Sequence, residues 1–394
     1  MNQQDFDIVI VGAGIVGLSF ALELADTDFT IAIVERNPLA EVKPETDCRV
    51  SAINRFALQQ FRQHGVFQSE LAQRICAYDK MFVWDQTGAG QIQFDSAEIG
   101  VSELGAIIEN TVLQTMLFAA LQKADNISFY CPEQINAIEY SAEKAGEKSI
   151  VELASGKKLC ADLLVGADGV YSKVADVAHI QRTQSSYQQQ GLVCNVRTSE
   201  SHQHTAWQCF MPSGPLALLP LFNGESSIVW SLDQSRADEI MALDDAAFRS
   251  ELAQASEFQL GEVTAVSQRF VFPLAHGHVS DYIKPGLALI GDAAHSIHPL
   301  AGQGANLGIA DAAVLADVLI AAKKANRCWS AEHTLKKYQR QRKGANRIME
   351  VSMTGFKQLF GEDNAFISEL RNAGLSLVDN LPALKYRLIR QALG

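Results

Sequence analysis

Glycine-rich motifs with acidic residues nearby indicate the chemistry that this chain could perform. The first motif has the pattern Gly-x-Gly-x-x-Gly at residues 12–17, between two apolar runs, and the second of these runs ends in Glu35. Gly12 permits a tight turn, Gly14 lets a pyrophosphate approach a helix N-terminus, and Gly17 lets a helix pack closely on a strand. The carboxylate of Glu35 can accept hydrogen bonds from a ribose. The pattern predicts a dinucleotide site without deciding between FAD and NAD(P).

Two further motifs place an aspartate beside a glycine at the end of an apolar run. In the second motif, the run 163–166 leads into Asp168-Gly169. An ordinary turn is the alternative interpretation, since Asp-Gly is common in turns. In the third motif, the run 286–290 ends in Gly291-Asp292. An aspartate at the carboxyl end of a parallel strand lies where ligands bind in open α/β sheets.

A glycine pair follows the third motif. Residues 299–306 read Pro-Leu-Ala-Gly-Gln-Gly-Ala-Asn, and apolar residues then recur at helical spacing. Gly302 and Gly304 open this predicted helix, so its free N–H groups point at whatever lies before it. The pair lacks a strand directly before it and an acid-terminated strand after it, so it does not predict a second nucleotide-binding domain.

The runs and turn signals predict the elements that must position these motifs. The β-branched runs 8–11 and 31–34 are typical of strands buried on both faces of a parallel sheet. Between the second and third motifs the pattern changes to antiparallel strands, with Asn223-Gly224 as a hairpin signal. A second hairpin is predicted to join 81–84 to 91–94, and Asp244 is predicted to cap a helix over 245–254.

These elements predict an α/β (α+β) fold with a Rossmann-like dinucleotide-binding domain built on a parallel sheet. A mostly antiparallel sheet domain for the substrate is inserted into it, and a helical region ends the chain. The predicted boundaries are 1–75, 100–182 and 270–350 for the discontinuous dinucleotide-binding domain, 76–99 and 183–269 for the sheet domain, and 351–394 for the C-terminal helical region.

Composition and charge exclude several classes of protein. The 394 residues are 47% hydrophobic and carry a net charge of −12, which supports a large core and argues against nucleic-acid binding. The seven cysteines are scattered without a Cys-x-x-Cys pattern, so we expect buried, reduced thiols. The apolar run 8–22 is too short and too rich in glycine for a membrane span, and acidic residues precede it, so it is no signal peptide. We expect a soluble, cytoplasmic protein.

The three motifs together resemble those of the class A FAD-dependent aromatic hydroxylases, of the para-hydroxybenzoate hydroxylase type. A narrower resemblance, to the hydroxylases of ubiquinone biosynthesis of the UbiI, UbiF and UbiH type, rests on the segments 108–114, 291–308 and 381–394. In this family the first motif holds the ADP half of FAD, the second lies near the pyrophosphate and the NAD(P)H path, and the third binds the ribityl chain. Position 175 departs from the pattern: Ala175 stands where many relatives have an arginine.

The resemblance implies which residues bind FAD. Arg49 resembles the family arginine that reaches the flavin or its phosphates, for which a surface salt bridge is the alternative. Pro299, Gly302 and Gly304 are expected to face the reactive side of the flavin and are the predicted catalytic residues. The predicted FAD-binding residues are Gly12, Ala13, Gly14, Gly17, Glu35, Arg36, Arg49, Gln114, Asp168, Gly169, Gly291, Asp292, Pro299, Gly302, Gly304, Ala305 and Asn306. No metal is predicted, since His276/His278 and His295/His298 lack a carboxylate or thiolate at ligand spacing.

The activity implied by the resemblance is hydroxylation of an aromatic ring. NAD(P)H would reduce FAD, O₂ would add to the reduced ring, and a flavin hydroperoxide would deliver one oxygen atom to a polyprenylated phenol or benzoquinol of ubiquinone biosynthesis. A flavin-fold reductase or a non-catalytic flavin-binding partner is the alternative. The sequence does not decide the ring position, the choice of NADH or NADPH, or the oligomeric state, which includes a homo-oligomer or a multi-enzyme complex.

The C-terminal part differs in charge from the rest of the chain. Residues 331–394 carry more Lys and Arg than Asp and Glu, against the acidic balance of the whole. One hypothesis is that this region contacts an anionic membrane surface, peripherally at the inner membrane, or a lipid-presenting partner. The alternative is a solvated helix followed by a terminal helix docked on its own core.

Overall fold

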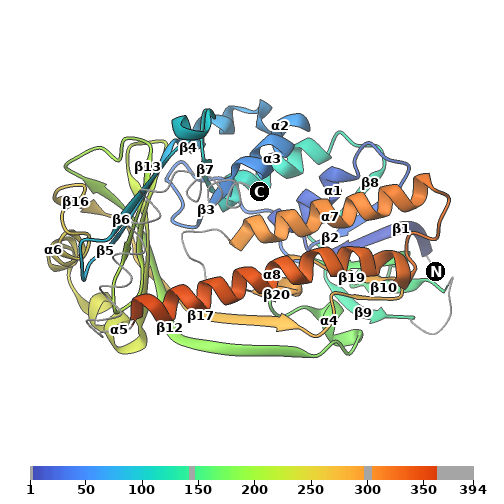
Figure 1. The fold of residues 1–394 in the computed structure, drawn as a ribbon. Coiled ribbons are helices and arrows are strands. Elements are labelled where there is room, and N and C mark those ends of the chain that lie inside the picture. Colours follow the sequence, from blue (N-terminus) through green and yellow to red (C-terminus); the bar gives the residue numbers. More distant parts are fainter. Residues whose placement is uncertain (1–2, 142–146, 297–303, 362–394) are drawn as a thin grey trace.

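A computed structural model describes residues 3–141, 147–296 and 304–361, and the strands within them form three sheets. An eight-stranded sheet and a nine-stranded sheet lie at opposite ends of the molecule (Figure 1). A three-stranded sheet completes the set, made of β3 (Val50–Asn54), β4 (Cys76–Tyr78) and β7 (Gly105–Glu109).

The eight-stranded sheet has parallel strands at its centre. Within the described residues its order is β18-β19-β11-β1-β2-β8, and the antiparallel strands β10 and β9 extend it from β11. Every residue of β2 and the last four of β1 are buried, which confirms the prediction from the β-branched runs. The strands are β1 (Gln3–Val11), β2 (Ile31–Val34), β8 (Ile127–Tyr130), β9 (Ile135–Glu139), β10 (Ser149–Leu153), β11 (Lys158–Gly166), β18 (Ile283–Lys284) and β19 (Leu287–Leu289).

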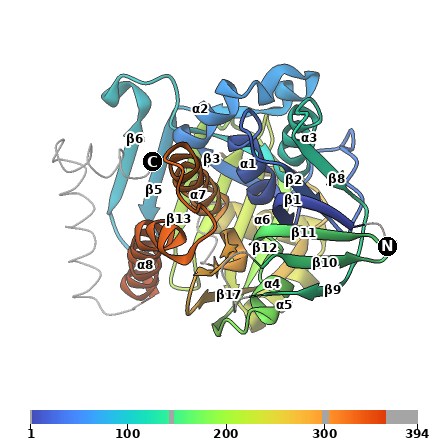
Figure 2. The ribbon, with the colours of Figure 1, turned by 90° about the vertical axis from the view of Figure 1, so that its right-hand side faces the viewer.

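The strand register brings several carboxyl ends to one edge of this sheet. β1, β2, β11 and β19 are parallel, with Val11 paired to Val34 and to Gly166, and Gly166 paired to Leu289. Helix α1 (Ile15–Glu23) contacts both α3 (Asn110–Leu121) and α7 (Gly304–Lys324), which lie beside it in Figure 2. The loops that follow these four strands therefore meet beside the start of α1.

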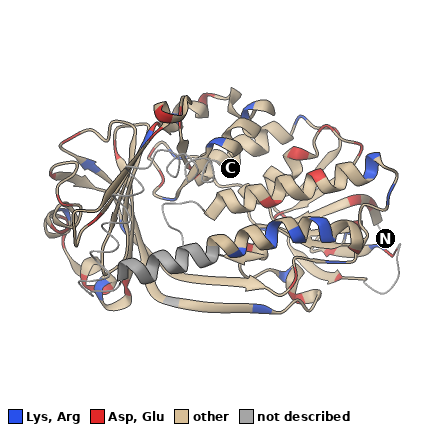
Figure 3. Ribbon diagram, in the orientation of Figure 1, with Lys and Arg blue, Asp and Glu red and all other residues tan. Residues whose placement is uncertain are grey.

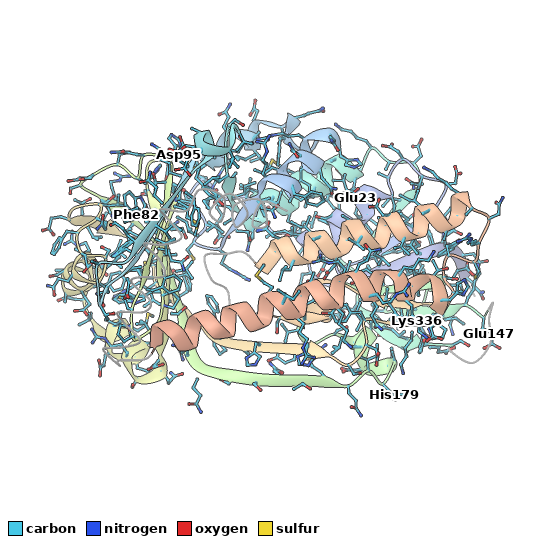
Figure 4. All side chains as sticks on the ribbon, in the orientation of Figure 1. Glu23, Phe82, Asp95, Glu147, His179 and Lys336 are labelled. Carbon is cyan, nitrogen blue, oxygen red and sulfur yellow. The ribbon has the colours of Figure 1, made fainter. Side chains whose placement is uncertain are left out.

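The nine-stranded sheet is antiparallel except where its two pieces of sequence join. β13 pairs in parallel with β5, because β5 enters from the earlier piece of chain, and β5 forms the predicted hairpin with β6. Phe82 of β5, labelled in Figure 4, contacts Trp84 and Trp207 at ring-centroid distances of 5.8 and 5.3 Å. The strands are β5 (Lys80–Asp85), β6 (Gln91–Asp95), β12 (Arg182–Thr198), β13 (Thr205–Phe210), β14 (Leu216–Pro220), β15 (Ser226–Asp233), β16 (Val263–Val266), β17 (Phe270–Val279) and β20 (His295–Ser296).

Two helices pack on one face of this sheet, with Ala237 and Ile240 of α5 and Phe248 and Leu252 of α6 in its core cluster. They are α5 (Gln234–Ala242) and α6 (Asp245–Ala255). The side chain of Asp244 caps α6 by accepting a hydrogen bond from the Ala247 N–H at 2.8 Å, as predicted.

Strands β12 and β17 run along the molecule from one sheet toward the other (Figure 1). They pair with each other from Arg182 opposite Val279 to Val193 opposite Phe270. The predicted boundaries near residues 182 and 270 therefore fall within strands that both parts of the molecule share. The division into domains stays a prediction.

The remaining helices differ in burial. Among the described residues, α7 alone is long and apolar enough, by length and composition, to cross a membrane, and 56% of its most apolar stretch is buried inside the protein. The other helices are α2 (Arg55–Gln63), α4 (Lys173–Val177), α8 (Glu332–Gly361) and short 3₁₀ turns at Val66–Gln68, Glu70–Arg74, Ser96–Ile99 and Gly291–Ala293.

Cys328 is exposed, and Cys48 and Cys131 are half-buried, so the expectation of buried thiols is wrong for these three.

Candidate functional site

The three glycine motifs meet at the carboxyl edge of the parallel strands. The Gly12 N–H donates to the Val34 carbonyl at 2.8 Å, and the Ala167 N–H donates to the Val11 carbonyl at 2.8 Å. The Ile290 N–H donates to the carbonyl of Gly166 at 3.0 Å. Each hydrogen bond joins the first residue after one strand to the last residue of the neighbouring strand. Residues of the three motifs and Glu35 therefore lie close together at this edge of the sheet.

The first motif has two packed glycines and one that faces open space. Gly12 has φ +107°, and a Cβ atom built on it would lie 2.4 Å from the Ala167 carbonyl oxygen. A Cβ on Gly17 would lie 2.2 Å from the carbonyl oxygen of Gly12. A Cβ on Gly14 meets none of the described residues within 4 Å, and Gly14 caps α1 without a side-chain hydrogen bond. The N–H groups at the start of α1 therefore border an open cradle suited to an anion.

Both peptide groups of Ala13 are held by side chains from other elements. The Ala13 N–H donates to Oε2 of Glu35 at 3.0 Å, and Nε2 of Gln114 on α3 donates to the Ala13 carbonyl at 2.6 Å. The other oxygen of Glu35 accepts from the Asn37 N–H at 3.0 Å, and the neighbouring Arg36 is exposed. Glu35 and Gln114 therefore shape the glycine turn as well as bordering the cradle.

The second motif ends β11 in the predicted tight turn. Gly169 has φ +80° and open space where a side chain would be. Oδ2 of Asp168 accepts from the Lys173 N–H at 2.7 Å, at the start of α4. Its Oδ1 is buried without a hydrogen-bond partner among the described residues, and burial raises the pKa of this carboxyl against the hydrogen bonds it accepts. An unpaired buried oxygen costs free energy, which a bound donor would offset.

The third motif places Asp292 at the mouth of a small cavity. Gly291 has φ +58°, and a Cβ on it would lie 3.1 Å from Val16 of α1. The Asp292 side chain is exposed, and it lines the cavity together with Val170 of the second motif and Arg182 of β12. The structure thus places the second and third motifs side by side.

The segment after the third motif is described from Gly304 onward. Pro299 and Gly302 lie outside the described residues. Gly304 starts α7, and a Cβ built on it meets no described residue within 4 Å. Ala305 is half-buried. The Asn306 side chain bonds the backbone of β3, accepting from the Asn54 N–H at 2.9 Å and donating to the Ala52 carbonyl at 2.7 Å. Asn306 therefore positions the start of α7 against β3.

Arg49 lies at the end of a loop that a buried ion pair supports. Arg49 is exposed and forms no ion pair among the described residues. Arg74 binds both carboxylate oxygens of Glu109 at 2.8 and 2.7 Å and also donates to the carbonyls of Lys43 and Glu45, upstream of Arg49. The Asp47 N–H donates to Glu109 as well, at 2.6 Å. This support was not predicted, because 35 positions separate Arg74 from Glu109.

A second support that was not predicted lies beneath the third motif. Asp311 of α7 is fully buried, and its Oδ2 accepts from the Gly291 N–H at 3.1 Å. An acidic residue on the apolar face of a core helix is a signal that could have revealed it, since buried charges need partners.

These residues fit FAD by their chemistry. The uncapped N-terminus of α1 above Gly14 suits a pyrophosphate, and the carboxylate of Glu35 suits a ribose. Asp292 offers an exposed carboxylate at the next strand end. Among the described residues, no group of three or more His, Cys, Asp and Glu side chains is placed to hold a metal ion.

Comparison with known proteins agrees with this geometry. Residues 5–351 match the FAD binding domain family. The 3-demethoxyubiquinol 3-hydroxylase of Escherichia coli is 35% identical over the whole of both chains. A mitochondrial ubiquinone biosynthesis monooxygenase of Danio rerio is 32% identical over 98% of this chain and 89% of its own length.

Solved structures with the same fold are more distant in sequence. A p-nitrophenol 4-monooxygenase of Pseudomonas putida superposes with a TM-score of 0.79 at 17% identity, covering 100% of this chain and 99% of its own. A probable FAD-dependent monooxygenase of Pseudomonas aeruginosa superposes with a TM-score of 0.78 at 21% identity, over 94% and 99% of the two chains. At such identities the likeness establishes the fold.

Proposed function

The chain belongs to the FAD binding domain family and is a flavin-dependent monooxygenase, and from that premise we propose that it hydroxylates a polyprenylated phenol or benzoquinol intermediate of ubiquinone biosynthesis. The observation that carries the proposal is the full-length match to the 3-demethoxyubiquinol 3-hydroxylase at 35% identity. A demethoxyubiquinol is therefore the first substrate to test. The fold is compatible with this proposal, because one chain holds a sheet that carries the cradle for a dinucleotide and a second, nine-stranded sheet that could bind a substrate.

The chain's own residues position the cofactor and the substrate. FAD, when bound, supplies the oxygen chemistry. Gly14 and the start of α1 would hold its pyrophosphate, Glu35 a ribose, and Asp292 the ribityl chain. Placement and exclusion of water are then the protein's main contributions. The predicted roles of Pro299, Gly302 and Gly304 at the reactive side of the flavin remain part of this proposal.

Product analysis tests the proposed activity. The purified enzyme, loaded with FAD and given NAD(P)H and a short-chain demethoxyubiquinol, should incorporate one atom of isotopically labelled O₂ into the ring. Asp292→Ala should lower FAD occupancy or stop turnover while the chain stays folded. NAD(P)H oxidation that no phenol stimulates, with no labelled product, would instead favour a flavin-fold reductase. Full flavin content with unchanged coupled hydroxylation in Asp292→Ala would refute the role of that carboxylate.

We propose that Arg182, beside a small cavity between the second and third motifs, contacts a phosphate of NAD(P)H. Arg182 lines this cavity beside Val170 and Asp292, and one terminal nitrogen of its guanidinium is buried without a hydrogen-bond partner among the described residues. A buried cationic donor of this kind favours an anionic ligand. Arg182→Met should raise the KM for NAD(P)H and leave the Kd for FAD unchanged, as measured by steady-state kinetics and flavin titration. An unchanged KM would exclude this cavity.

Contact with a membrane surface is proposed for the outer side of α8. Lys337, Arg340 and Arg347 are exposed there, and α8 carries several of the basic bands in Figure 3. Lys336, which Figure 4 places at the end of the molecule opposite Phe82, pairs with Glu332 at 2.8 Å. A polyprenylated substrate partitions into the bilayer, so an enzyme with a basic face could collect it at an anionic surface. The segment 381–394 lies outside the described residues.

A further inference from the structure

A buried polar cluster beneath the third motif has no role in the proposed reaction. Asp311 lies at its centre, and the two carboxylate oxygens accept hydrogen bonds from four groups. Oδ2 accepts from the Gly291 N–H at 3.1 Å and from Nε2 of His295 at 2.5 Å. Oδ1 accepts from Nε of Arg342 at 2.7 Å and from Nδ2 of Asn346 at 3.2 Å. The cluster joins the third motif to α7 and to α8.

The Asp311 carboxylate carries its charge inside the protein, beside an imidazole and a guanidinium. Burial alone would raise the pKa of Asp311, but His295 and Arg342 together hold the pKa of this carboxyl below its usual range. The carboxylate is therefore ionised when it accepts from Gly291. Hydrogen bonds to an ionised acceptor are stronger than those between neutral groups, so the Gly291 N–H is firmly held.

One face of α8 forms hydrogen bonds to the backbone of β19, just before Gly291, and to the backbone of α7. The hydroxyl of Tyr338 donates to the Leu289 carbonyl at 2.7 Å, and NH2 of Arg342 donates to the Leu307 carbonyl at 3.3 Å. NH2 of Arg342 also donates to Oδ1 of Asn346 at 2.9 Å. Residues 338, 342 and 346 follow one another at four-residue spacing, which places them on one side of a helix.

We propose that Asp311, Arg342 and Asn346 are positioning residues that hold the Gly291 turn in the conformation that presents Asp292 to FAD. Glycine adopts the φ of +58° at Gly291 without strain, so its own conformational preference does not fix this turn, and the hydrogen bond from its N–H to Asp311 holds it while Asp292 stays exposed. Asp311 supplies that support, and Arg342 and Asn346 fix the orientation of its carboxylate. Helix α8 is thereby part of the flavin site although none of its described residues belongs to the motifs.

Flavin titration of the full-length apoprotein tests this inference. Arg342→Met removes the charge and the hydrogen bonds at nearly constant side-chain length, and should weaken FAD binding roughly tenfold, by analogy with supporting residues around metal ligands. Arg342→Lys keeps the charge and should recover part of the affinity. The Kd for FAD is read from flavin fluorescence, and the rise in Tm on adding FAD gives a second readout that should shrink in Arg342→Met and recover in Arg342→Lys.

Glu103→Gln is the matched control. Glu103 is another poorly exposed carboxylate, paired with Arg62 at 2.8 Å and remote in the chain from the third motif. Its loss should lower Tm and leave the Kd for FAD unchanged. A merely structural role for Arg342 would give the same result, an unchanged Kd with a lower Tm, and would overturn the proposal.

A gentler variant keeps the proposal testable if Arg342→Met fails to fold. Asn346→Ala removes only the amide that donates to Oδ1 of Asp311 and accepts from Arg342. It should weaken FAD binding measurably, whereas an unchanged Kd would overturn the proposal. The inference rests on FAD as the cofactor of the proposed function, but the titration involves no substrate. If the native enzyme hydroxylated no demethoxyubiquinol but the variants lost FAD affinity as expected, the proposed substrate would be refuted and the positioning role would stand.

Discussion

At the scale of single residues, the glycines of the first motif have different physical reasons to be glycine. Gly12 and Gly17 are required by the protein itself, because a Cβ on either would collide with backbone atoms. No described residue lies within 4 Å of a Cβ built on Gly14, so the packing of the described part of the chain does not require a glycine there. We propose that the requirement at Gly14 comes from the cofactor that would approach the start of α1.

Substitution by valine separates these two reasons. Gly14→Val should abolish FAD binding while changing the free energy of unfolding of the apoprotein by no more than about 1 kcal/mol, the scale of an N-cap change. Gly17→Val should destabilise the apoprotein itself, by about 1–3 kcal/mol or more, through overpacking. Urea unfolding and flavin titration of both variants check this. A Gly14→Val protein that purifies with stoichiometric flavin would contradict our assignment of the cradle.

At the scale of elements, the loop that leads to Arg49 is held by both halves of the molecule. The pair of Arg74 and Glu109 holds it on one side, and the Asn195 side chain of β12 donates to the Thr46 carbonyl at 2.9 Å on the other. Glu109 is 2% exposed and Arg74 is 13% exposed by side chain. Loss of one partner from such a pair leaves an uncompensated buried charge.

Arg74→Met should therefore destabilise the protein by about 3–5 kcal/mol. The double variant Arg74→Met with Glu109→Gln should recover part of this loss, because the buried charge is then absent. Denaturant unfolding of the two variants measures the difference, and the visible spectrum of bound flavin reports on the loop. If the double variant were less stable than Arg74→Met alone, the ion pair would not be the cause of the loss.

At the scale of the whole molecule, α8 faces two environments. Its inner face carries Tyr338, which bonds the Leu289 carbonyl, and Arg342 and Asn346, which bond Asp311 of α7. Its outer face carries exposed cations on a protein with a net charge of −12. This asymmetry of charge is what an anionic surface would recognise, since the body of the protein is repelled by it.

Charge reversal on α8 tests the membrane contact. Each basic residue near an anionic surface contributes about 1 kcal/mol. Arg340→Glu changes the charge by two units, so it should weaken binding to phosphatidylserine-containing vesicles by about 2 kcal/mol, or roughly thirtyfold. The control Lys123→Glu reverses another exposed cation, directly after α3, and should bind as the native protein does. Vesicle co-sedimentation at two salt concentrations measures both. Equal losses in the two variants would mean that net charge alone, and not α8, decides the binding.

The sequence by itself determined what depends on neighbouring residues along the chain. The β-branched runs of β1 and β2, the glycine turn into α1, the Asp168-Gly169 turn and the Asp244 cap all involve contacts within a few positions, so their residue patterns predict them. The family was likewise evident from local motifs. The position of Asp292 at a strand end follows from the apolar run that precedes it and from the rule for ligand sites in parallel sheets.

Only the tertiary structure decided which distant residues support these motifs. Gln114 reaches Ala13 from 101 positions away, Arg342 reaches Asp311 from 31, and β5 pairs with β13 in parallel. Such contacts have no periodic signal, because they depend on how helices and strands pack after they form. The predicted cofactor-binding residues lie in local motifs that the sequence displays, whereas the residues that hold these motifs in place became visible only when the chain was folded.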